Sequence, residues 1–191
     1  DIVSNLVSLK SLIINSYTAT SIPALDELTA LESLTISMEL VQDYSTISTV
    51  PTLISLSVVN GGDNLSNIDF IKTLTGVKYL NLIGNSITDV TPLSGLTELL
   101  MLGLGHNKIE SIAPLAALEK LTYLEAQFNY IQDVSPLANL ADLTEVYMPV
   151  NTVEDISPLA NVTTIDMTNQ IIFYEGKLPV PDIYVATEVR E

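Results

Sequence analysis

Few residues in this sequence are of the types that carry out chemistry. There is one histidine, His106, and no cysteine, which excludes a catalytic triad, a thiolate nucleophile and a metal site built from several histidines. Gly103 and Gly105 begin like a dinucleotide-binding fingerprint, but the third glycine is missing and no phosphate-binding loop occurs. We therefore expect no catalytic residue and no cofactor.

The acidic residues offer two weaker possibilities. Glu125 and Glu145 could mimic the carboxylate pair of a glycosidase, but no pocket that excludes water is predicted around them. Asp89, Asp133 and Asp155 recur at one position and could form a ladder of cation ligands. Each precedes a Thr or Ser and then a Pro, so we expect these carboxylates to accept hydrogen bonds from free backbone N–H groups instead. The sequence predicts no metal site.

Charge and hydropathy exclude several classes of partner. The 191 residues include 23 acidic and 7 basic side chains, and the net charge of −16 repels nucleic acid and anionic membrane surfaces. Apolar runs fall short of the ~20 residues that a membrane span needs. With 47% hydrophobic residues, the chain can bury one sizeable core. The negative surface fits a basic protein patch, or it serves solubility alone.

An internal repeat positions these residues. Four consecutive blocks share the pattern LxxLxLxxNxIxxIxxLxx at a spacing of 22 residues, and three earlier blocks continue it upstream, one of them lengthened to 24 residues. The repeats begin near residues 6, 28, 50, 74, 96, 118 and 140, with a partial one near 162. Such a period predicts a stack of equivalent turns.

The pattern predicts one short parallel strand per repeat. Leu80 and Leu82 lie two residues apart and so share one side of a strand, which can be buried only when successive turns stack at ~4.8 Å. The asparagine of the pattern lies where the chain turns inward, and we expect its amide to bond unpaired backbone groups at Asn85, Asn107, Asn129 and Asn151. Pro92 and its counterparts fit the first position of 3₁₀ turns.

The first three repeats depart from this pattern. Tyr17, Glu39 and either Asn60 or Gly61 occupy the asparagine position. We therefore expect the N-terminal third to be less regular, and residues 61–63 to form a protruding turn.

These repeats resemble leucine-rich repeats of the short bacterial type, and the segments that begin at Asp89, Asp133 and Asp155 resemble those of internalins. The resemblance covers residues 6–167. It implies an α/β-type solenoid, a leucine-rich-repeat horseshoe with a parallel β-sheet on the concave face and 3₁₀ turns on the convex face. It also implies a secreted or bacterial cell-surface protein that binds a host or cell-surface protein, as in adhesion and virulence.

The ends of the chain define the remaining organisation. We assign residues 1–167 to the repeat domain and residues 168–191 to a separate strand segment, interrupted by Pro179 and Pro181. In internalins an immunoglobulin-like module follows the repeats, so this segment resembles either the opening of that module or a cap. Because such a module needs ~100 residues, we favour a fragment of a longer protein. The chain begins at Asp1 without the features of a signal peptide.

The outward strand positions form the predicted binding surface because they have no packing role. They carry mostly hydroxyl and amide groups in the first three repeats, whereas the later repeats present residue types that dominate binding hot spots, namely Tyr79, Met101, Tyr123 and Tyr147. Tyr79, Met101 and Tyr123 share one column, with the two rings ~10 Å apart. We expect a partner to dock on the C-terminal half.

Gly103 and Gly105 predict a notch beside Met101, because glycine in a strand often marks the close approach of a ligand. Alternatively, these glycines only relieve crowding inside the curve. The predicted surroundings of the notch are Asn81 and Ile83 on one side, Glu125 and Gln127 on the other, and His106 and Phe128 at the rim. The predicted partner-binding set is Tyr79, Asn81, Met101, Gly103, Gly105, Tyr123, Glu125, Gln127, Phe128 and Tyr147.

Two other functions stay open. The chain could be a structural spacer that presents another module, which the plain face of the first three repeats favours. It could also bind glycans or cell-wall material, with the spaced tyrosines as stacking platforms. No nucleic-acid partner and no membrane insertion is predicted.

Overall fold

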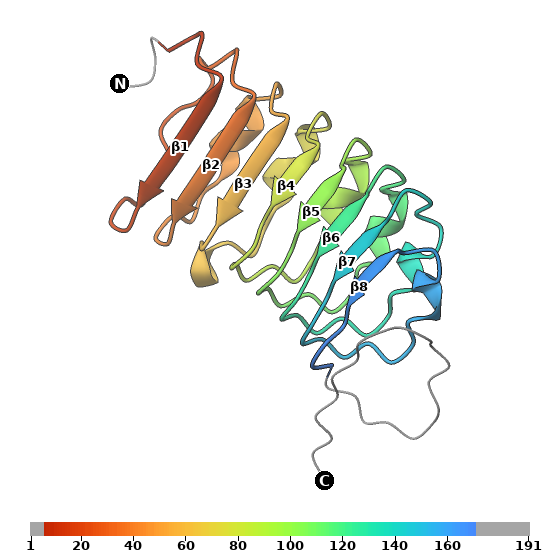
Figure 1. Ribbon diagram of the computed structural model, residues 1–191. Helices are drawn as coiled ribbons and strands as arrows, with labels where there is room; N and C mark the ends of the chain where they lie inside the picture. Colours follow the sequence, from red (N-terminus) through yellow and green to blue (C-terminus); the bar gives the residue numbers. More distant parts are fainter. Residues whose placement is uncertain (1–5, 171–191) are drawn as a thin grey trace.

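The computed structural model describes residues 6–170, which form a curved solenoid with one eight-stranded parallel sheet in sequence order (Figure 1). The strands are β1 Ser11–Ser16, β2 Ser33–Met38, β3 Ser55–Val59, β4 Tyr79–Asn81, β5 Met101–Gly103, β6 Tyr123–Glu125, β7 Glu145–Tyr147 and β8 Thr164–Asp166. Equivalent residues pair directly, as Leu80 does with Leu102. The predicted solenoid is confirmed, whereas the strand segment predicted for residues 168–191 lies, from residue 171 on, outside the described residues.

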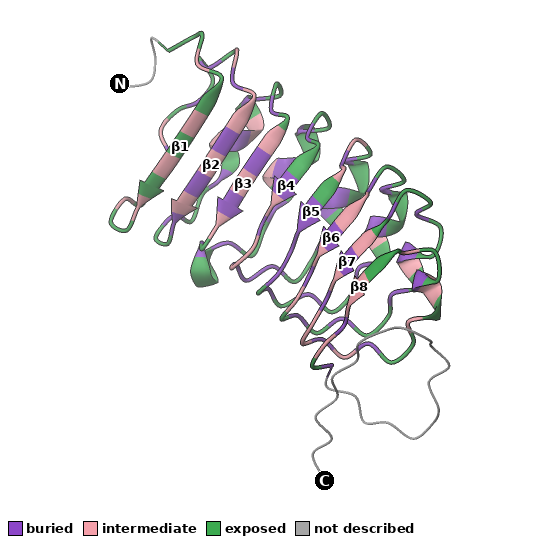
Figure 2. Cartoon of the chain, viewed as in Figure 1, coloured by how far each residue is buried: buried purple, intermediate pink, exposed green. Residues whose placement is uncertain are grey.

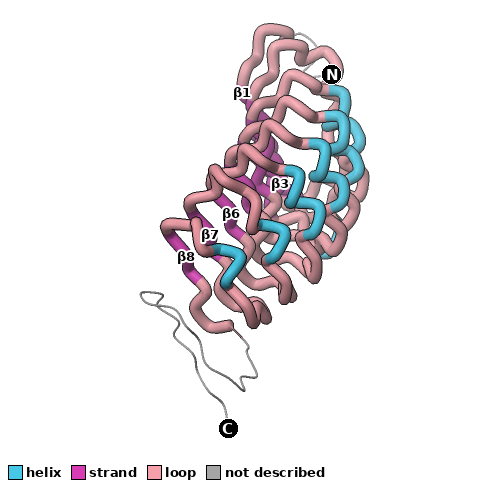
Figure 3. Tube along the Cα trace, turned by 90° about the vertical axis from the view of Figure 1, so that its right-hand side faces the viewer, coloured by secondary structure: helices cyan, strands magenta, loops and turns pink. Residues whose placement is uncertain are grey.

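Short 3₁₀ helices line the side of the solenoid opposite the sheet (Figure 3). They are η1 Ser45–Thr49, η3 Asp69–Thr73, η4 Thr91–Gly95, η5 Ala113–Ala117, η6 Ser135–Leu137 and η7 Ser157–Leu159. The first helical position was predicted for Pro92, but Pro92 is the second residue of its helix. Its missing N–H still costs no bond, because the first helical bond runs from the Leu93 N–H to the Val90 carbonyl, at 3.0 Å. No helix of the described residues is long and apolar enough to cross a membrane.

The core lies between the sheet and the 3₁₀ helices, so the inward strand residues are buried (Figure 2). Leu80 and Leu82 are 3% and 0% exposed, which confirms that both strand leucines face inward. The shortened eighth repeat continues this arrangement: Ile165 pairs with Val146, and Met167 is buried. Every repeat therefore contributes one rung to a continuous apolar core.

A ladder of buried asparagine amides ties each C-terminal turn to the one before it. The Asn107 Nδ2 donates to the carbonyls of Leu82 and Leu104, both at 2.9 Å, and its Oδ1 accepts from the Ile87 N–H at 3.0 Å. Asn85, Asn129 and Asn151 make equivalent bonds. The predicted role of the asparagine is confirmed. Gln170 takes the same place in the last repeat, accepting from Val153 and donating to Met148.

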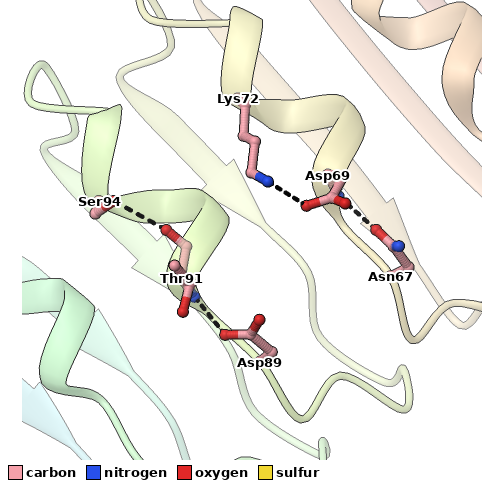
Figure 4. Close-up of polar contacts among 6 residues, drawn as sticks. All are labelled: Asn67, Asp69, Lys72, Asp89, Thr91 and Ser94. Atoms are coloured by element: carbon pink, nitrogen blue, oxygen red, sulfur yellow. Dashed lines mark hydrogen bonds and ion pairs between the residues drawn. The ribbon is translucent and has the colours of Figure 1, made fainter.

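Acidic side chains lie just before several of the convex helices and bond the first N–H group of the helix, as predicted. The Asp89 Oδ1 accepts from the Thr91 N–H at 2.8 Å, and Asn67 does the same for Asp69 in the preceding repeat (Figure 4). Asp133 and Asp155 bond the N–H groups of the serines two residues later, also at 2.8 Å. The hydroxyl and N–H of Thr91 hold the pKa of Asp89 below its ordinary value. These carboxylates thus accept hydrogen bonds from free N–H groups at the start of the convex helices, as predicted.

The expectation that the N-terminal third is less regular is confirmed only in part. It lacks the asparagine ladder, and no 3₁₀ helix lies between β1 and β2, but its strands are more regular than those that follow. β1 and β2 are six residues long and pair along their full length, whereas each strand from β4 onward has three residues. Gly61, and not Asn60, aligns with the asparagine position, because strand register pairs Leu56 with Leu80, five residues before Gly61 and Asn85 respectively. The insertion forms the exposed helix η2 Gly62–Asn64 after β3, so Gly62 and Asp63 protrude as predicted, whereas Gly61 is buried.

Candidate functional site

The outward side chains of the sheet form two neighbouring columns on the concave face. Strand register places Ser55, Tyr79, Met101, Tyr123 and Glu145 in the first column, which confirms the predicted alignment of Tyr79, Met101 and Tyr123. The second column contains Ser57, Asn81, Gly103, Glu125, Tyr147 and Asp166. Tyr79 and Met101 are 43% and 42% exposed, so both are available to a partner.

A shallow hollow of about 320 Å³ lies over the middle of these columns. The outward residues that line it are Ser55, Ser57, Tyr79, Asn81, Met101, Gly103, Tyr123 and Glu125, together with Ile83 at one edge. Aromatic and thioether groups flank the hollow, and the absence of a side chain at Gly103 forms part of its floor. The structure thus brings together most of the predicted contact residues in one depression.

The hollow is displaced from the predicted notch. A Cβ atom on Gly105 would lie only 2.6 Å from the Gln127 side-chain amide, so Gln127 covers Gly105 and fills that part of the notch. A Cβ on Gly103 would lie 3.1 Å from the Asn81 Oδ1 and 3.3 Å from the Ile83 Cδ1. Both glycines therefore give room to side chains of adjacent repeats, and the hollow reaches Gly103 but not Gly105.

Two tyrosines and two glutamates form a connected cluster beside the hollow. The rings of Tyr123 and Tyr147 are 5.5 Å apart between centroids. The Tyr123 hydroxyl donates to the Glu125 Oε2 at 3.3 Å, and the Tyr147 hydroxyl donates to the Glu145 Oε2 at 3.4 Å. Burial and the charge of Glu125 raise the pKa of Tyr123 to about 12, and burial and Glu145 raise the pKa of Tyr147. Both phenols consequently remain protonated near neutral pH.

Gln127 fixes the Glu125 carboxylate from the other side. Its Nε2 donates to the Glu125 Oε1 at 2.6 Å. The Gln127 Oε1 is buried without a hydrogen-bond partner, an arrangement that normally costs free energy. Glu125 is thus held between a phenol and an amide, with both oxygens oriented before any partner binds.

The rim of the face carries a second aromatic pair. The rings of His106 and Phe128 stack with centroids 4.3 Å apart, and Phe128 is 47% exposed. Both residues have left-handed backbone, with φ of 54° and 53°, and their N–H groups donate to Gln127 and Pro149. Neither residue lines the hollow, so their predicted place at the rim of the notch stays a prediction. Their left-handed conformation was not predicted, although it recurs immediately before the asparagine position at Gly84 and Val150.

The eight described strands of the concave sheet contain no Lys or Arg, although Lys10 and Lys78 directly precede β1 and β4. The ion pairs found in residues 6–170 link Lys10 to Glu32, Lys72 to Asp69, Lys108 to Asp63 and Lys120 to Glu98. Glu125, Glu145 and Asp166 take part in none of these pairs, and sequence reasoning did not single out Asp166. The described residues contain no group of three or more His, Asp or Glu side chains arranged to hold a metal ion.

Comparison with known proteins places this geometry in context. Residues 75–117 match a family model described as leucine-rich repeats in two copies. A search of curated proteins gave no match. Among solved structures, an internalin of Listeria monocytogenes (InlF) is 34% identical with a TM-score of 0.82; the alignment covers 89% of this chain and 51% of that one. This chain therefore spans about half the length of that relative.

Two further structures extend the comparison. Internalin C2 of Listeria monocytogenes is 33% identical with a TM-score of 0.76, and the alignment covers 84% of this chain and 72% of that one. A plant peptide hormone receptor, RGFR1, solved in complex with RGF2, has a TM-score of 0.66 at 18% identity, with 89% of this chain and 30% of the receptor covered. The receptor shares the fold alone.

Proposed function

This chain belongs to the internalins, a group of leucine-rich-repeat proteins, and from that premise we propose that it binds a partner protein on its concave sheet. The observation that carries the proposal is that polar and aromatic residues occupy different halves of that face. Mostly small polar residues cover β1 to β3, where Ile13 is the exposed apolar exception, whereas Tyr79, Met101, Tyr123 and Tyr147 lie together on β4 to β7 in and beside the hollow. An open aromatic surface with no packing role is typical of a binding site.

The chemistry of these side chains supports protein recognition. Tyrosine contributes a large apolar area and a polar tip, and it loses little conformational freedom on binding. The Tyr123 and Tyr147 rings already contact each other, so part of their ordering precedes binding. We propose that the contact surface comprises Tyr79, Asn81, Met101, Gly103, Tyr123, Glu125 and Tyr147, with Gln127 over Gly105 and Phe128 at its rim.

The proposal includes location and the class of partner. We assign the chain a non-catalytic role in a secreted or cell-surface bacterial protein, with a host or cell-surface protein as partner, because internalin relatives share its repeats. Adhesion and virulence belong to this same proposal. The shallow, open form of the face supports a binding role over a catalytic one, since catalysis generally requires a site that excludes water.

A capture experiment with two matched variants tests the proposal. The first variant replaces Tyr79, Tyr123 and Tyr147 with Ala. The second replaces Ser33, Thr35 and Ser37 with Ala; these three residues face outward on β2, away from the hollow. Partners captured from host-cell and bacterial-envelope extracts are identified and then titrated in purified form. We expect the tyrosine variant to lose more than about hundredfold in affinity, since each hot-spot residue contributes ~2 kcal/mol or more, and the serine–threonine variant to bind normally.

The same experiment separates the alternatives. A structural spacer would bind nothing through this face, so both variants would retain whatever the unmodified chain captures. A glycan-binding face would retain purified oligosaccharides or cell-wall fragments, and the tyrosine variant would lose them. Unchanged capture of a protein by the tyrosine variant would contradict the proposed function.

A further inference from the structure

Resting on the proposed function, we propose that the hollow on β3 to β6 receives a basic side chain, an arginine or a lysine, from the bound segment of the partner. The proposal identifies the chemistry of one contact within the proposed binding face. It follows from the walls of the hollow, from the fixed carboxylate at one end, and from the charge around it.

The walls of the hollow fit the stem and head of a long cationic side chain. Tyr79 and Tyr123 flank Met101 in one column, so two aromatic rings and a thioether line the same depression. Aromatic faces attract ammonium and guanidinium groups, and a methionine side chain accommodates an apolar stem of variable shape. The volume of about 320 Å³ is at the lower end of the range for small-ligand pockets, which suits one side chain better than a folded element.

A single oriented carboxylate lies at one end of this hollow. Glu125 lines it, and its two oxygens are held by the Tyr123 hydroxyl at 3.3 Å and the Gln127 amide at 2.6 Å. These neutral donors orient the carboxylate but do not neutralise it. A carboxylate oxygen accepts more than one hydrogen bond, so Glu125 can still accept from a guanidinium or an ammonium group.

The surrounding charge favours a cation over any other occupant. No strand residue of the sheet is basic, and no Lys or Arg of the described part forms an ion pair with Glu125. Glu145 and Asp166 extend the negative region toward β8, on either side of Tyr147. A neutral side chain that covered Glu125 would bury an uncompensated charge, and an acidic one would be repelled. A basic side chain removes both costs.

Met101 provides a site-specific probe of the hollow. The chain has four methionines, and Met38, Met148 and Met167 are buried in the core, whereas Met101 lines the hollow. The full chain with ¹³C-methyl methionine is titrated with a short glycine–serine peptide that contains one arginine, and separately with its twin in which citrulline, a neutral isostere, replaces the arginine. The three core methyl signals serve as internal controls for folding.

The expected result is a saturable shift of the Met101 methyl signal with the arginine peptide, with a Kd in the millimolar range, and little or no shift with the citrulline peptide. Glu125→Gln keeps a hydrogen-bond acceptor but removes the charge, so we expect it to weaken arginine-peptide binding about tenfold. Glu119→Gln, an exposed change outside the strands, should leave the affinity unchanged.

Three outcomes would overturn the inference: equal binding of both peptides, unchanged affinity in Glu125→Gln, or no saturable shift at Met101. These outcomes differ from a failure of the proposed function. A partner that is lost by the tyrosine variant but bound normally by Glu125→Gln would support recognition on the concave face and contradict the contact with a basic side chain.

Discussion

The three N-terminal repeats and the five that follow share one core but turn away from the sheet differently. In the first group the asparagine position holds Tyr17, Glu39 and Gly61, and β1 and β2 run on for six residues. In the second group a buried Asn ladder follows a left-handed residue, and the strands have three residues. Leucine spacing is therefore sufficient for the repeats to stack. The asparagine is associated with the point at which the chain turns away from the sheet after each strand.

The two regions also differ on their concave face, whereas the convex turns of repeats 2 to 7 are alike. Asp43 in the second repeat and Asp133 in the sixth both bond the N–H of a serine two residues later, at 2.8 Å. The sheet, by contrast, changes from Ser33 and Ser55 to Tyr79 and Tyr123 within one column. Apart from the first repeat, which has no 3₁₀ helix, the difference therefore lies on the surface proposed to bind a partner and in the turn at its edge.

The largest expected effect comes from removing one amide of the ladder. Asn107→Ala leaves the buried carbonyls of Leu82 and Leu104 and the Ile87 N–H without their partner, so we expect unfolding to become easier by about 3 kcal/mol or more. Glu39→Ala, at the equivalent but exposed position of the second repeat, should cost less than ~0.5 kcal/mol. Urea unfolding followed by circular dichroism measures both. Equal losses of stability would show that the asparagine contributes no more to its turn than Glu39 does to the equivalent N-terminal turn.

The next effect tests the junction between the two regions. A Cβ on Gly61 would lie 2.7 Å from the Asn85 Oδ1 and 3.0 Å from the Tyr44 hydroxyl, so Gly61→Ala disturbs the first amide of the ladder. We expect a loss of about 1–3 kcal/mol in the free energy of unfolding, as for overpacking in a core. Gly95→Ala meets nothing within 4 Å and should be neutral or slightly stabilising. A neutral Gly61→Ala would mean that Asn85 moves aside at no cost.

The sequence predicts most of this fold because the relevant forces repeat. Leu80, Leu82 and Asn85 each recur every 22 residues, and one repeat can bury its leucines only against the next. The longer N-terminal strands were missed because the missing asparagine was treated as a loss of order. In the structure, Tyr44 is buried there and its hydroxyl donates to the Met38 carbonyl, a bond that lies outside the repeat pattern.

The candidate site was predictable only in part. Strand alternation is sufficient to place Tyr79, Met101 and Tyr123 in one column. Whether Gly105 opens a notch depends on the rotamer of Gln127 in the next repeat, and no periodicity specifies a side-chain torsion. The Tyr123–Tyr147 contact is diagonal between two columns, so it too requires coordinates.

A smaller effect should follow from removing the buried hydroxyl of Tyr44 in the second repeat. The bond from Tyr44 to the Met38 carbonyl is long, at 3.4 Å, and buried. We expect Tyr44→Phe to lower the free energy of unfolding by about 1 kcal/mol, the net contribution of one hydrogen bond. Tyr17→Phe, on a ring that is 82% exposed, is the matched control and should have no effect. Urea unfolding of the two variants measures both changes. A stabilising Tyr44→Phe would contradict the view that this hydrogen bond stabilises the fold.

The smallest effect concerns the convex side, where the two regions should behave alike. Hydrogen bonds from the hydroxyl and N–H of the following serine lower the pKa of both Asp43 and Asp133. A lowered folded-state pKa stabilises the fold above the ordinary carboxyl pKa of about 4, and this contribution disappears as the pH falls through the folded-state value. Asp43→Asn and Asp133→Asn keep an acceptor but remove the charge, so each should have a slightly lower Tm than the unmodified chain near pH 7 and the same Tm near pH 2. Thermal scans across this range give the comparison, and a clearly larger change for one variant than for the other would show that the convex caps, like the concave turns, differ between the two regions.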